Sequence, residues 1–304
     1  MRILLLNPNQ INRYNWGHQL FRNEIGCQHD VVYYGEGFTG FDKRILDVRQ
    51  IIRHMYGQSQ PDLIMTYGWR YSKDFTGLGK VDVPKVHILV DYVRPQSIPK
   101  QNKFFAKNKY DLIFTITQRV YRSMRKFNPH IRVRILPFSV DTNIYKPLPV
   151  KKKDWVLAAF NTRQDVYPNR LKIRQILKQM GIKTITKATH QKLVEFINKC
   201  KISVTSNNIY GSLSMRYTEV LACGGFLLAD EPEDLALVGF EDGKHLVIYK
   251  DLEDFKDKVL YYLKHDEERE RIAKQGMKFV RKNHSCKKRV QEMTTMIMEE
   301  LKIE

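Results

Sequence analysis

The sequence predicts an α/β protein with two doubly wound domains that face a central cleft. Short apolar, β-branched runs alternate with amphipathic segments along nearly the whole chain of 304 residues. A single proline-rich stretch around residues 136–150 interrupts this alternation. Strands that alternate with helices form βαβ units with right-handed crossovers and therefore a parallel sheet. Two such sheets would bind a ligand between them, at the carboxyl ends of their strands.

Six apolar runs in the first half are bounded by polar or turn residues, as buried parallel strands are. We expect these strands at Arg2–Leu6, Asp30–Tyr34, Asp62–Thr66, Lys85–Val90, Asp111–Ile116 and Arg132–Leu136. Two segments between them, Asp42–Tyr56 and Gln118–Phe127, carry apolar side chains at helical spacing. The second helix should end before Asn128-Pro129, because proline disfavours helical backbone in the residue before it.

The stretch from Leu136 to Val150 holds three prolines in 15 residues and has no hydrophobic periodicity, which is typical of a linker. Beyond it, strands are expected at Asp154–Phe160, Ile182–Thr186, Ile202–Ser206, Phe226–Ala229 and Leu246–Tyr249. Helices are expected at Asn169–Met180, His190–Cys200, Ser214–Ala222, Asp254–Leu263, Asp266–Val280 and Cys286–Leu301. We therefore expect a first domain (1–140), a linker (141–153), a second domain (154–284) and a C-terminal helix (285–304) that packs back on the first domain.

Composition excludes several classes of protein. Hydrophobic residues make up 42% of the chain, enough to bury a core, so a disordered protein is not expected. No apolar run approaches the roughly 18 residues of a membrane-spanning helix. The apolar start Met1–Leu6 is cut short by Asn7-Pro8, which argues against a secretory signal. The four cysteines form no CxxC pair, so we expect reduced thiols, a cytoplasmic protein and no metal site.

One motif resembles a dinucleotide fingerprint but is misplaced. The segment Gly35–Gly40, called the glycine loop below, matches G-x-G-x-x-G. It follows the second expected strand instead of the first, and the acid nearest the required spacing, Asp62, opens a strand instead of ending one. We therefore expect a mobile loop beside the cleft and no dinucleotide site.

The stretch Asn207–Asp230 is the most informative one. A strand and a loop of small polar residues lead into a helix with Ser214 at its N-cap. Free N–H groups and a positive dipole end allow a helix N-terminus to bind phosphate. Arg216 would add a bidentate donor to a diphosphate, and Glu219 could accept hydrogen bonds from ribose hydroxyls. On these residues alone, an ordinary N-cap and a solvated glutamate would be the commoner explanation.

A family resemblance favours the functional interpretation. The segment Arg216-Tyr217-Thr218-Glu219-Val220-Leu221-Ala222-Cys223-Gly224-Gly225 resembles the donor-site signature of glycosyltransferases with the two-domain, Rossmann-like glycosyltransferase-B fold. It looks most similar to the spore-maturation-type (CgeB-like) branch of the group 1 glycosyl transferases. Residues 240–249 and 265–276 resemble the same branch. So does the hinge formed by Leu136–Asp141 and Tyr145–Pro147, which makes the likeness strong over residues 130–290.

The resemblance implies that the second domain binds a nucleoside diphosphate sugar, such as a UDP-sugar, and that no cofactor or metal is needed. It places Asn161, Arg163, Ser214, Arg216, Tyr217 and Glu219 at the nucleotide sugar, with Arg170 as a second basic candidate. Glu219 matches the second glutamate of the family's E-x7-E pair. The first would fall at position 211, which is glycine. That departure leaves the donor sugar and the anomeric outcome open.

The resemblance also assigns the acceptor site and any base to the first domain. Asp91 ends a strand at the ligand edge of the sheet, where it could remove a proton from an acceptor hydroxyl or cap a turn. Gly17 and His18, in the loop expected after the first strand, could approach the sugar phosphates. A solvated histidine is the alternative there.

Charge suggests the acceptor. The chain carries 52 basic and 33 acidic side chains, a net charge of +19. Residues 101–200 hold 22 basic and 5 acidic side chains, a net charge of +17, with aromatic residues interleaved. This pattern suits a phosphate-rich polymer, an anionic lipid surface or a merely solvated face.

Our first hypothesis from the sequence is therefore a glycosyltransferase that acts on an anionic polymer such as hydroxymethylated viral DNA. The second is a peripheral membrane glycosyltransferase of cell-surface glycan synthesis. The third is a non-catalytic nucleotide-sugar or nucleic-acid binding protein, which the missing glutamate at position 211 favours. The sequence does not predict an oligomeric state.

Overall fold

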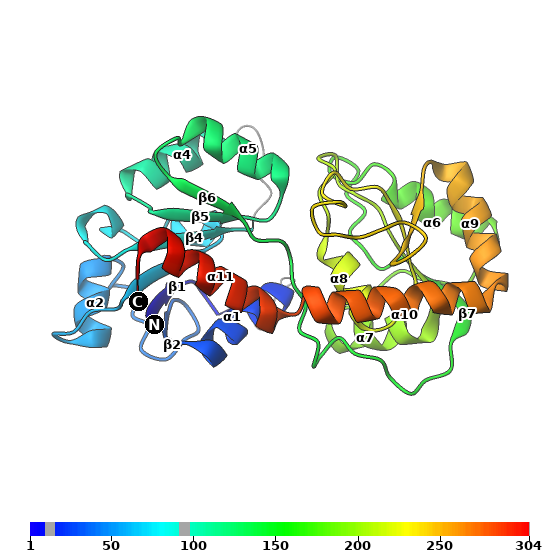
Figure 1. The fold of residues 1–304 in the computed structure, drawn as a ribbon, viewed down its shortest axis with the longest axis horizontal. Coiled ribbons are helices and arrows are strands. Elements are labelled where there is room, and N and C mark those ends of the chain that lie inside the picture. Colours follow the sequence, from blue (N-terminus) through cyan, green and yellow to red (C-terminus); the bar gives the residue numbers. More distant parts are fainter. Residues whose placement is uncertain (10–15, 91–97, 304) are drawn as a thin grey trace. The chain divides into compact units, whose positions relative to one another are not determined.

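A computed structural model of the chain describes residues 1–9, 16–90 and 98–303 (Figure 1). They form two compact units, the first made of residues 1–137 and 289–304 and the second of residues 138–288. Each unit holds one parallel sheet, which confirms the expected pair of α/β domains.

The segment 141–153, which we expected to be a linker, belongs to the second unit. Val140 N donates to His284 O at 3.0 Å, and Cys286 N donates to Val140 O at 2.9 Å. Tyr145 is 2% exposed. These contacts explain why the segment is part of a folded unit despite its prolines.

The first unit has a six-stranded sheet in the order β2-β1-β3-β4-β5-β6. Its strands are β1 (Arg2–Leu6), β2 (Asp30–Tyr34), β3 (Leu63–Tyr67), β4 (Lys85–Leu89), β5 (Leu112–Thr115) and β6 (Arg132–Ile135). All pairs are parallel, and each strand lies within two residues of its predicted bounds. Every residue of β3, β4 and β5 is buried, as the continuous apolar runs indicated.

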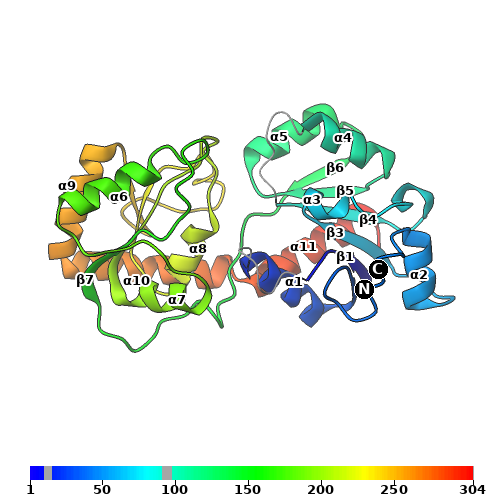
Figure 2. The ribbon, with the colours of Figure 1, turned by 180° about the vertical axis from the view of Figure 1, so that it is seen from behind.

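Helices cover both faces of this sheet. They are α1 (Trp16–Gln28), α2 (Val48–Tyr56), α3 (Trp69–Ser72), η1 (Leu78–Lys80), α4 (Ile98–Lys107), α5 (Gln118–Phe127) and α11 (Cys286–Leu301). Helices α2, α4 and α5 share one core, which includes Ile51, Phe105 and Met124. On the other face, His29 after α1 lies 2.8 Å from Thr294 Oγ1 of α11, and Figures 1 and 2 show these two helices side by side.

Helix α1 corrects our expectation of a loop at Gly17 and His18. Leu20, Phe21 and Ile25 of this helix are buried. Glycine in the first turn and the polar residues between the apolar ones weaken the helical pattern in the sequence.

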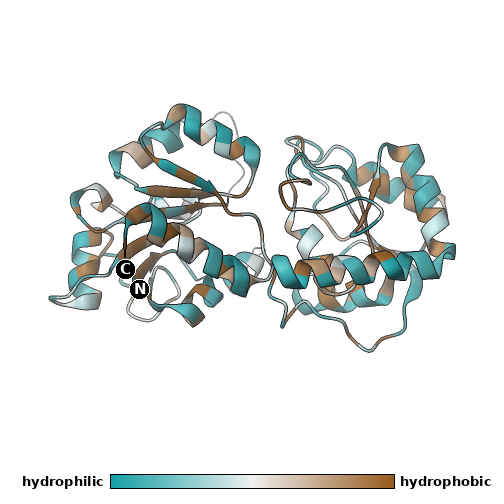
Figure 3. Cartoon of the chain, in the orientation of Figure 1, coloured by the Kyte–Doolittle hydropathy of each residue, from teal (hydrophilic) through white to brown (hydrophobic). Residues whose placement is uncertain are grey.

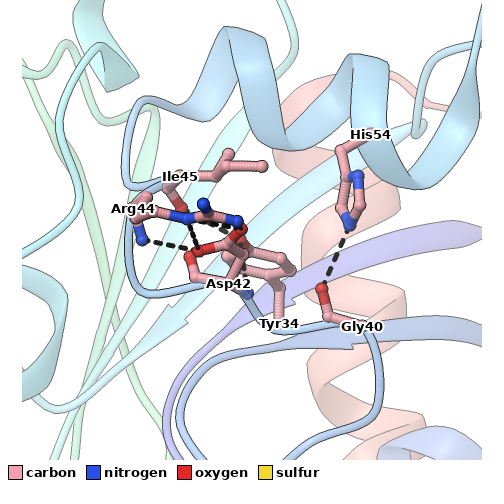
Figure 4. Close-up of polar contacts among 6 residues, drawn as sticks. All are labelled: Tyr34, Gly40, Asp42, Arg44, Ile45 and His54. Carbon is pink, nitrogen blue, oxygen red and sulfur yellow. Dashed lines mark hydrogen bonds and ion pairs between the residues drawn. The ribbon is translucent and has the colours of Figure 1, made fainter.

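The glycine loop is held by contacts within the first unit (Figure 4). The hydroxyl of the buried Tyr34 donates to Ile45 O at 2.9 Å and accepts from Asp42 N at 3.3 Å. His54 Nε2 lies 3.1 Å from Gly40 O. These contacts hold Gly40 and the residues after it in place between β2 and α2.

The second unit has a five-stranded parallel sheet in the order β11-β10-β9-β7-β8. Its strands are β7 (Lys153–Leu157), β8 (Thr184–Ile185), β9 (Cys200–Thr205), β10 (Leu227–Asp230) and β11 (Val247–Tyr249). Its helices are α6 (Arg170–Gln179), α7 (His190–Lys199), α8 (Met215–Ala222), α9 (Leu252–Lys264) and α10 (Asp266–Asn283). The apolar strands lie inside these helices, whose outer sides are polar (Figure 3).

Two further expectations concern the thiols and the membrane. All four cysteines are free, and Cys27 is the exposed one. Within the described ranges, no helix combines the length and apolar character needed to cross a bilayer.

Candidate nucleotide-sugar site in the second unit

The carboxyl edge of the second sheet brings most of the predicted donor-site residues together. Strands β7, β9 and β10 are parallel neighbours, with Leu157 beside Ser203 and Thr205 beside Ala229. The loops that follow these strands therefore leave the sheet at one edge, where α/β sheets bind their ligands. Asn161 and Arg163 follow β7, and the loop 206–214 leads from β9 into α8.

Arg170, at the start of α6, joins the loops after β7 and β9. Its Nε donates to Ser206 O at 2.9 Å, and its Nη1 donates to Asn161 O at 3.3 Å. The guanidinium lies 3.6 Å from the centroid of the Tyr167 ring. Burial lowers the pKa of Arg170 to about 10, so the group stays charged at neutral pH. This residue, our second basic candidate, thus has a clear structural role.

Arg174, one turn after Arg170, supports the same region. Its Nε donates to Ala158 O at 3.1 Å, and its Nη2 donates to Phe160 O at 2.6 Å. Two arginines spaced i, i+4 lie on one face of a helix. Together they satisfy backbone carbonyl groups along the loop that leaves β7.

Ser214 stands at the N-cap of α8, as the sequence predicted, but its hydroxyl does not cap the helix. Ser214 Oγ is buried and has no hydrogen-bond partner within the described part of the chain. The first N–H groups of a helix have no intrahelical partner, and they carry the positive end of its dipole. The start of α8 can therefore donate to an anion, with the Ser214 hydroxyl available beside it.

Arg216 and Glu219 form a largely buried ion pair on α8, with side chains 17% and 11% exposed. Arg216 Nη2 donates to Ala159 O at 3.0 Å, while Nη1 lies 3.3 Å from Glu219 Oε2. That Nη1 is buried and forms no hydrogen bond to any described residue. Glu219 Oε1 accepts a hydrogen bond of 2.9 Å from the hydroxyl of Tyr145. Burial and the carboxylate raise the pKa of Tyr145, so this hydroxyl remains a donor.

Arg163 is the exposed cation of the group. Its side chain is 52% exposed and forms an ion pair of 2.7 Å with Asp165, itself 64% exposed. Arg163 N also donates to Asn161 Oδ1 at 2.9 Å. Exposed ion pairs contribute little free energy, so an incoming phosphate can replace Asp165 as the partner.

Tyr217 has a different environment from the one we expected. Its side chain is fully buried, and its hydroxyl donates to Asp230 O at 2.7 Å. The ring therefore fixes α8 against β10 and offers no surface to a nucleotide.

The side chain of Glu233 lies beside Gly211, the position at which the family pattern has a glutamate. Gly211 has a φ of 65° and accepts a hydrogen bond of 2.9 Å from Glu233 N. A Cβ atom on Gly211 would lie 2.9 Å from Glu233 Cγ and 3.3 Å from Glu233 Oε1. The side chain of Glu233 thus fills the space that a side chain at position 211 would enter. No sequence pattern indicated this contact, because it depends on how the loop after β10 folds.

Asp230, at the end of β10, is a second residue that sequence reasoning missed. It accepts hydrogen bonds from Ser206 Oγ at 2.8 Å and from Asn207 N at 2.7 Å. Burial raises its pKa, and those two hydrogen bonds oppose the shift. A pocket of about 580 Å³ adjoins it, lined also by Asn169, Glu231 and Tyr249. The strand-terminal aspartate in Phe-Leu-Leu-Ala-Asp was the available signal.

The predicted residues of the first unit are placed differently. His18 lies in α1, with its Nδ1 2.8 Å from the Tyr67 hydroxyl. Burial and then the charge of Arg22 lower the pKa of His18 to about 4, so it is neutral near pH 7 and poorly suited to bind phosphate. Gly17 is in the first turn of the same helix. Asp91 lies outside the described residues.

The described ranges contain no group of three or more histidine, cysteine, aspartate or glutamate side chains that could hold a metal ion. The candidate site itself can offer an anion the N-terminus of α8 and arginine side chains, and it can offer hydroxyl groups the carboxylates of Glu219 and Glu233.

Comparison with known proteins finds one family match, which covers most of the second unit. Residues 154–295 match the model of the glycosyl transferase-like family. A comparison with curated proteins found no match. Among solved structures, the chain is similar to Anabaena HepE in complex with UDP and glucose, with 12% identity and a TM-score of 0.71 over 98% of this chain and 100% of that one.

Two more solved structures are similar over their full lengths. A glycosyltransferase from Rickettsia africae is 10% identical, with a TM-score of 0.69 over 100% of this chain and 99% of that one. Sucrose-phosphate synthase from Thermosynechococcus elongatus is 10% identical, with a TM-score of 0.68 over 98% of both chains. At these identities the likeness shows a shared two-domain fold.

Arg170 and Arg163 should differ in their effect on stability. Arg170→Ala removes two hydrogen bonds to backbone carbonyls and a stacked cation, which should lower the free energy of unfolding by about 2–4 kcal/mol. Arg163→Ala, the matched control, removes only an exposed ion pair and should leave stability essentially unchanged. Denaturation by urea measures both, and equal losses would contradict the roles assigned to the two arginines.

Proposed function

We propose that this chain, whose residues 154–295 match the glycosyl transferase-like family, transfers a sugar from a uridine diphosphate sugar to a hydroxyl group. The observation that carries the proposal is the largely buried guanidinium of Arg216 at the start of α8, whose Nη1 forms no hydrogen bond to a described residue. UDP in the complexes of the structurally similar Anabaena protein supports uridine diphosphate as the nucleotide.

The diphosphate would lie at the N-terminus of α8. There it would accept hydrogen bonds from the backbone, from Ser214 and from Arg216, with Arg163 turning from Asp165 toward the outer phosphate. Negative charge grows on the diphosphate as the sugar leaves. Donors that are already in place stabilise that charge in the transition state more than in the bound substrate. This mechanism uses no redox cofactor.

Two carboxylates would orient the rest of the donor. Glu219 is held by Tyr145 and Arg216, and its oxygens have lone pairs left for the ribose hydroxyls. We assign the sugar hydroxyls to Glu233, whose carboxylate fills the space beside Gly211. A carboxylate supplied by the loop after β10 would compensate for the glycine at position 211.

We consider two candidates for the acceptor of the sugar. Hydroxymethylated viral DNA remains the hypothesis drawn from net charge, and an enzyme acting on a duplex base would have to flip it out of the stack. A peripheral enzyme of cell-surface glycan synthesis is the second candidate. The arrangement of basic side chains in the first unit, described in the next subsection, favours it. Asp91 stays our proposed base for either acceptor.

Binding of UDP tests the donor site. Arg216→Ala should weaken UDP binding by roughly tenfold to a hundredfold, because a charge-assisted hydrogen bond to the diphosphate is lost. Arg216→Lys keeps the charge and should recover part of the affinity, and Arg271→Ala, at an exposed position of α10, is the control. Titration calorimetry measures all four proteins. Unchanged affinity in a folded Arg216→Ala variant would refute the diphosphate assignment.

Glu233 should affect the sugar and not the nucleotide. Glu233→Gln should bind UDP as the wild type does, but should bind the intact UDP-sugar at least roughly tenfold more weakly, since a carboxylate accepts stronger hydrogen bonds than an amide. Glu267→Gln, an exposed glutamate of α10 that does not line the pocket, is the matched control. Competition binding with UDP and UDP-glucose gives the two affinities. Equal weakening of both ligands would remove Glu233 from the sugar site.

A further inference from the structure

Helices α4 and α5 of the first unit expose a surface that is basic throughout. We define the α4–α5 basic face by its eight exposed cations, which are Lys100, Lys103, Lys107, Lys109, Arg119, Arg122, Arg125 and Lys126. Residues 98–110 and 118–130, which contain both helices and the turns that end them, include no aspartate or glutamate.

Helical spacing aligns these cations on the outer side. Lys100, Lys103 and Lys107 are spaced i, i+3 and i+7 along α4, and Arg119, Arg122 and Lys126 repeat that spacing along α5. Positions with this spacing form one stripe of a helix. The buried residues lie on the opposite side, Gln101 and Phe105 in α4 and Val120 and Met124 in α5.

The two stripes lie next to each other. Both helices cover the same face of the first sheet, as Figures 1 and 2 show. Asn128, which ends α5, donates from Nδ2 to Asn102 Oδ1 of α4 at 2.7 Å. The stripes therefore lie on neighbouring helices over one face of the sheet. The outer sides of both helices are largely hydrophilic in Figure 3.

The charge of this face is not neutralised within the described residues. Apart from Arg119, none of the eight cations has an ion pair to a described side chain. Arg132 and Arg134 on the neighbouring strand β6 show the contrast, because both pair with Glu300 of α11. Repulsion among the seven cations other than Arg119 destabilises the fold unless an anionic partner offsets it.

An exposed aromatic side chain adjoins the same face. Phe127, the last residue of α5, is 53% exposed, and Lys126 Nζ lies 5.6 Å from the centroid of its ring. An aromatic ring beside lysines is typical of surfaces that insert into the headgroup region of a bilayer.

We propose that the α4–α5 basic face docks the protein on a membrane surface of anionic phospholipids. A lipid surface accepts point charges at any spacing, which suits five lysines spread over two helices. Nucleic acid would instead be recognised by one element entering a groove or by several stacking aromatics, and the described residues of this face offer a single exposed ring. Docking there would place the acceptor side of the enzyme at the membrane.

Vesicle co-sedimentation tests this proposal independently of sugar transfer. The full chain is mixed with vesicles of phosphatidylcholine alone or of phosphatidylcholine containing about one third phosphatidylserine, at low and high salt. We expect binding to the anionic vesicles only, and its loss at high salt.

A matched pair of variants separates this face from overall charge. Replacing Lys103, Lys107, Arg122 and Arg125 by glutamine should weaken vesicle binding by roughly a hundredfold or more, because each basic side chain near the surface adds to the affinity. The control replaces four exposed lysines of the second unit by glutamine, namely Lys172, Lys178, Lys187 and Lys274. It has the same net charge as the test variant and should bind the vesicles as the wild type does.

Three outcomes would overturn the proposal. Equal loss in both variants would mean that total charge, not this face, determines binding. No binding of the wild type to anionic vesicles would exclude the lipid partner. Binding of a short DNA duplex that depends on the four residues, with vesicle binding unaffected by them, would make the face a nucleic-acid surface.

Discussion

The candidate site depends on one buried cation, Arg170. Its guanidinium donates to backbone carbonyls of two loops, at Asn161 after β7 and at Ser206 after β9. Loop backbone at a sheet edge loses water when it is buried, and an unpaired carbonyl there would cost free energy. Arg170 meets that need while it brings the start of α8 and the residues after β7 to one place. Arg216 and Arg163, which we assign to the donor, are therefore brought together by a third arginine whose Nε and Nη1 donate to the backbone.

The basic side chains that produce the excess of positive charge also fall into two groups, those with partners inside a unit and those on its surface. Arginines of the second unit mostly have internal partners, namely carbonyl groups for Arg170 and Arg174 and a carboxylate for Arg163. The cations of α4 and α5 face away from the core and have no acidic neighbours in their own helices. The net charge of +17 in residues 101–200 is thus divided between two regions of the protein. Part of it lies at the donor site that we propose in one unit, and part of it lies on the exposed face of α4 and α5 in the other.

The sequence was sufficient for the fold and for the edge of the sheet that carries the site. Side chains that face the core are apolar and recur with the period of a strand or a helix. All the strands and most helices could therefore be predicted from the spacing of the apolar residues. Helix α1 could not, because Gln19 and Arg22 are buried polar residues within it. Tyr217 was assigned to the ligand although it packs inside, since a motif gives a residue's position but not the direction of its side chain. The position of Glu233 could not be predicted from the sequence, because its approach to Gly211 is a tertiary contact between two loops.

The most direct test of the account is the transfer reaction itself. The full chain is incubated with UDP-sugars and with candidate acceptors, which are hydroxymethylated DNA, unmodified DNA and anionic vesicles carrying glycan lipids, and release of UDP is followed together with labelling of the acceptor. We predict UDP release that depends on one of these acceptors and that Asp91→Asn abolishes without changing the affinity for UDP. Tight UDP binding without release or labelling under any condition would contradict the account and would indicate a non-catalytic nucleotide-sugar binding protein.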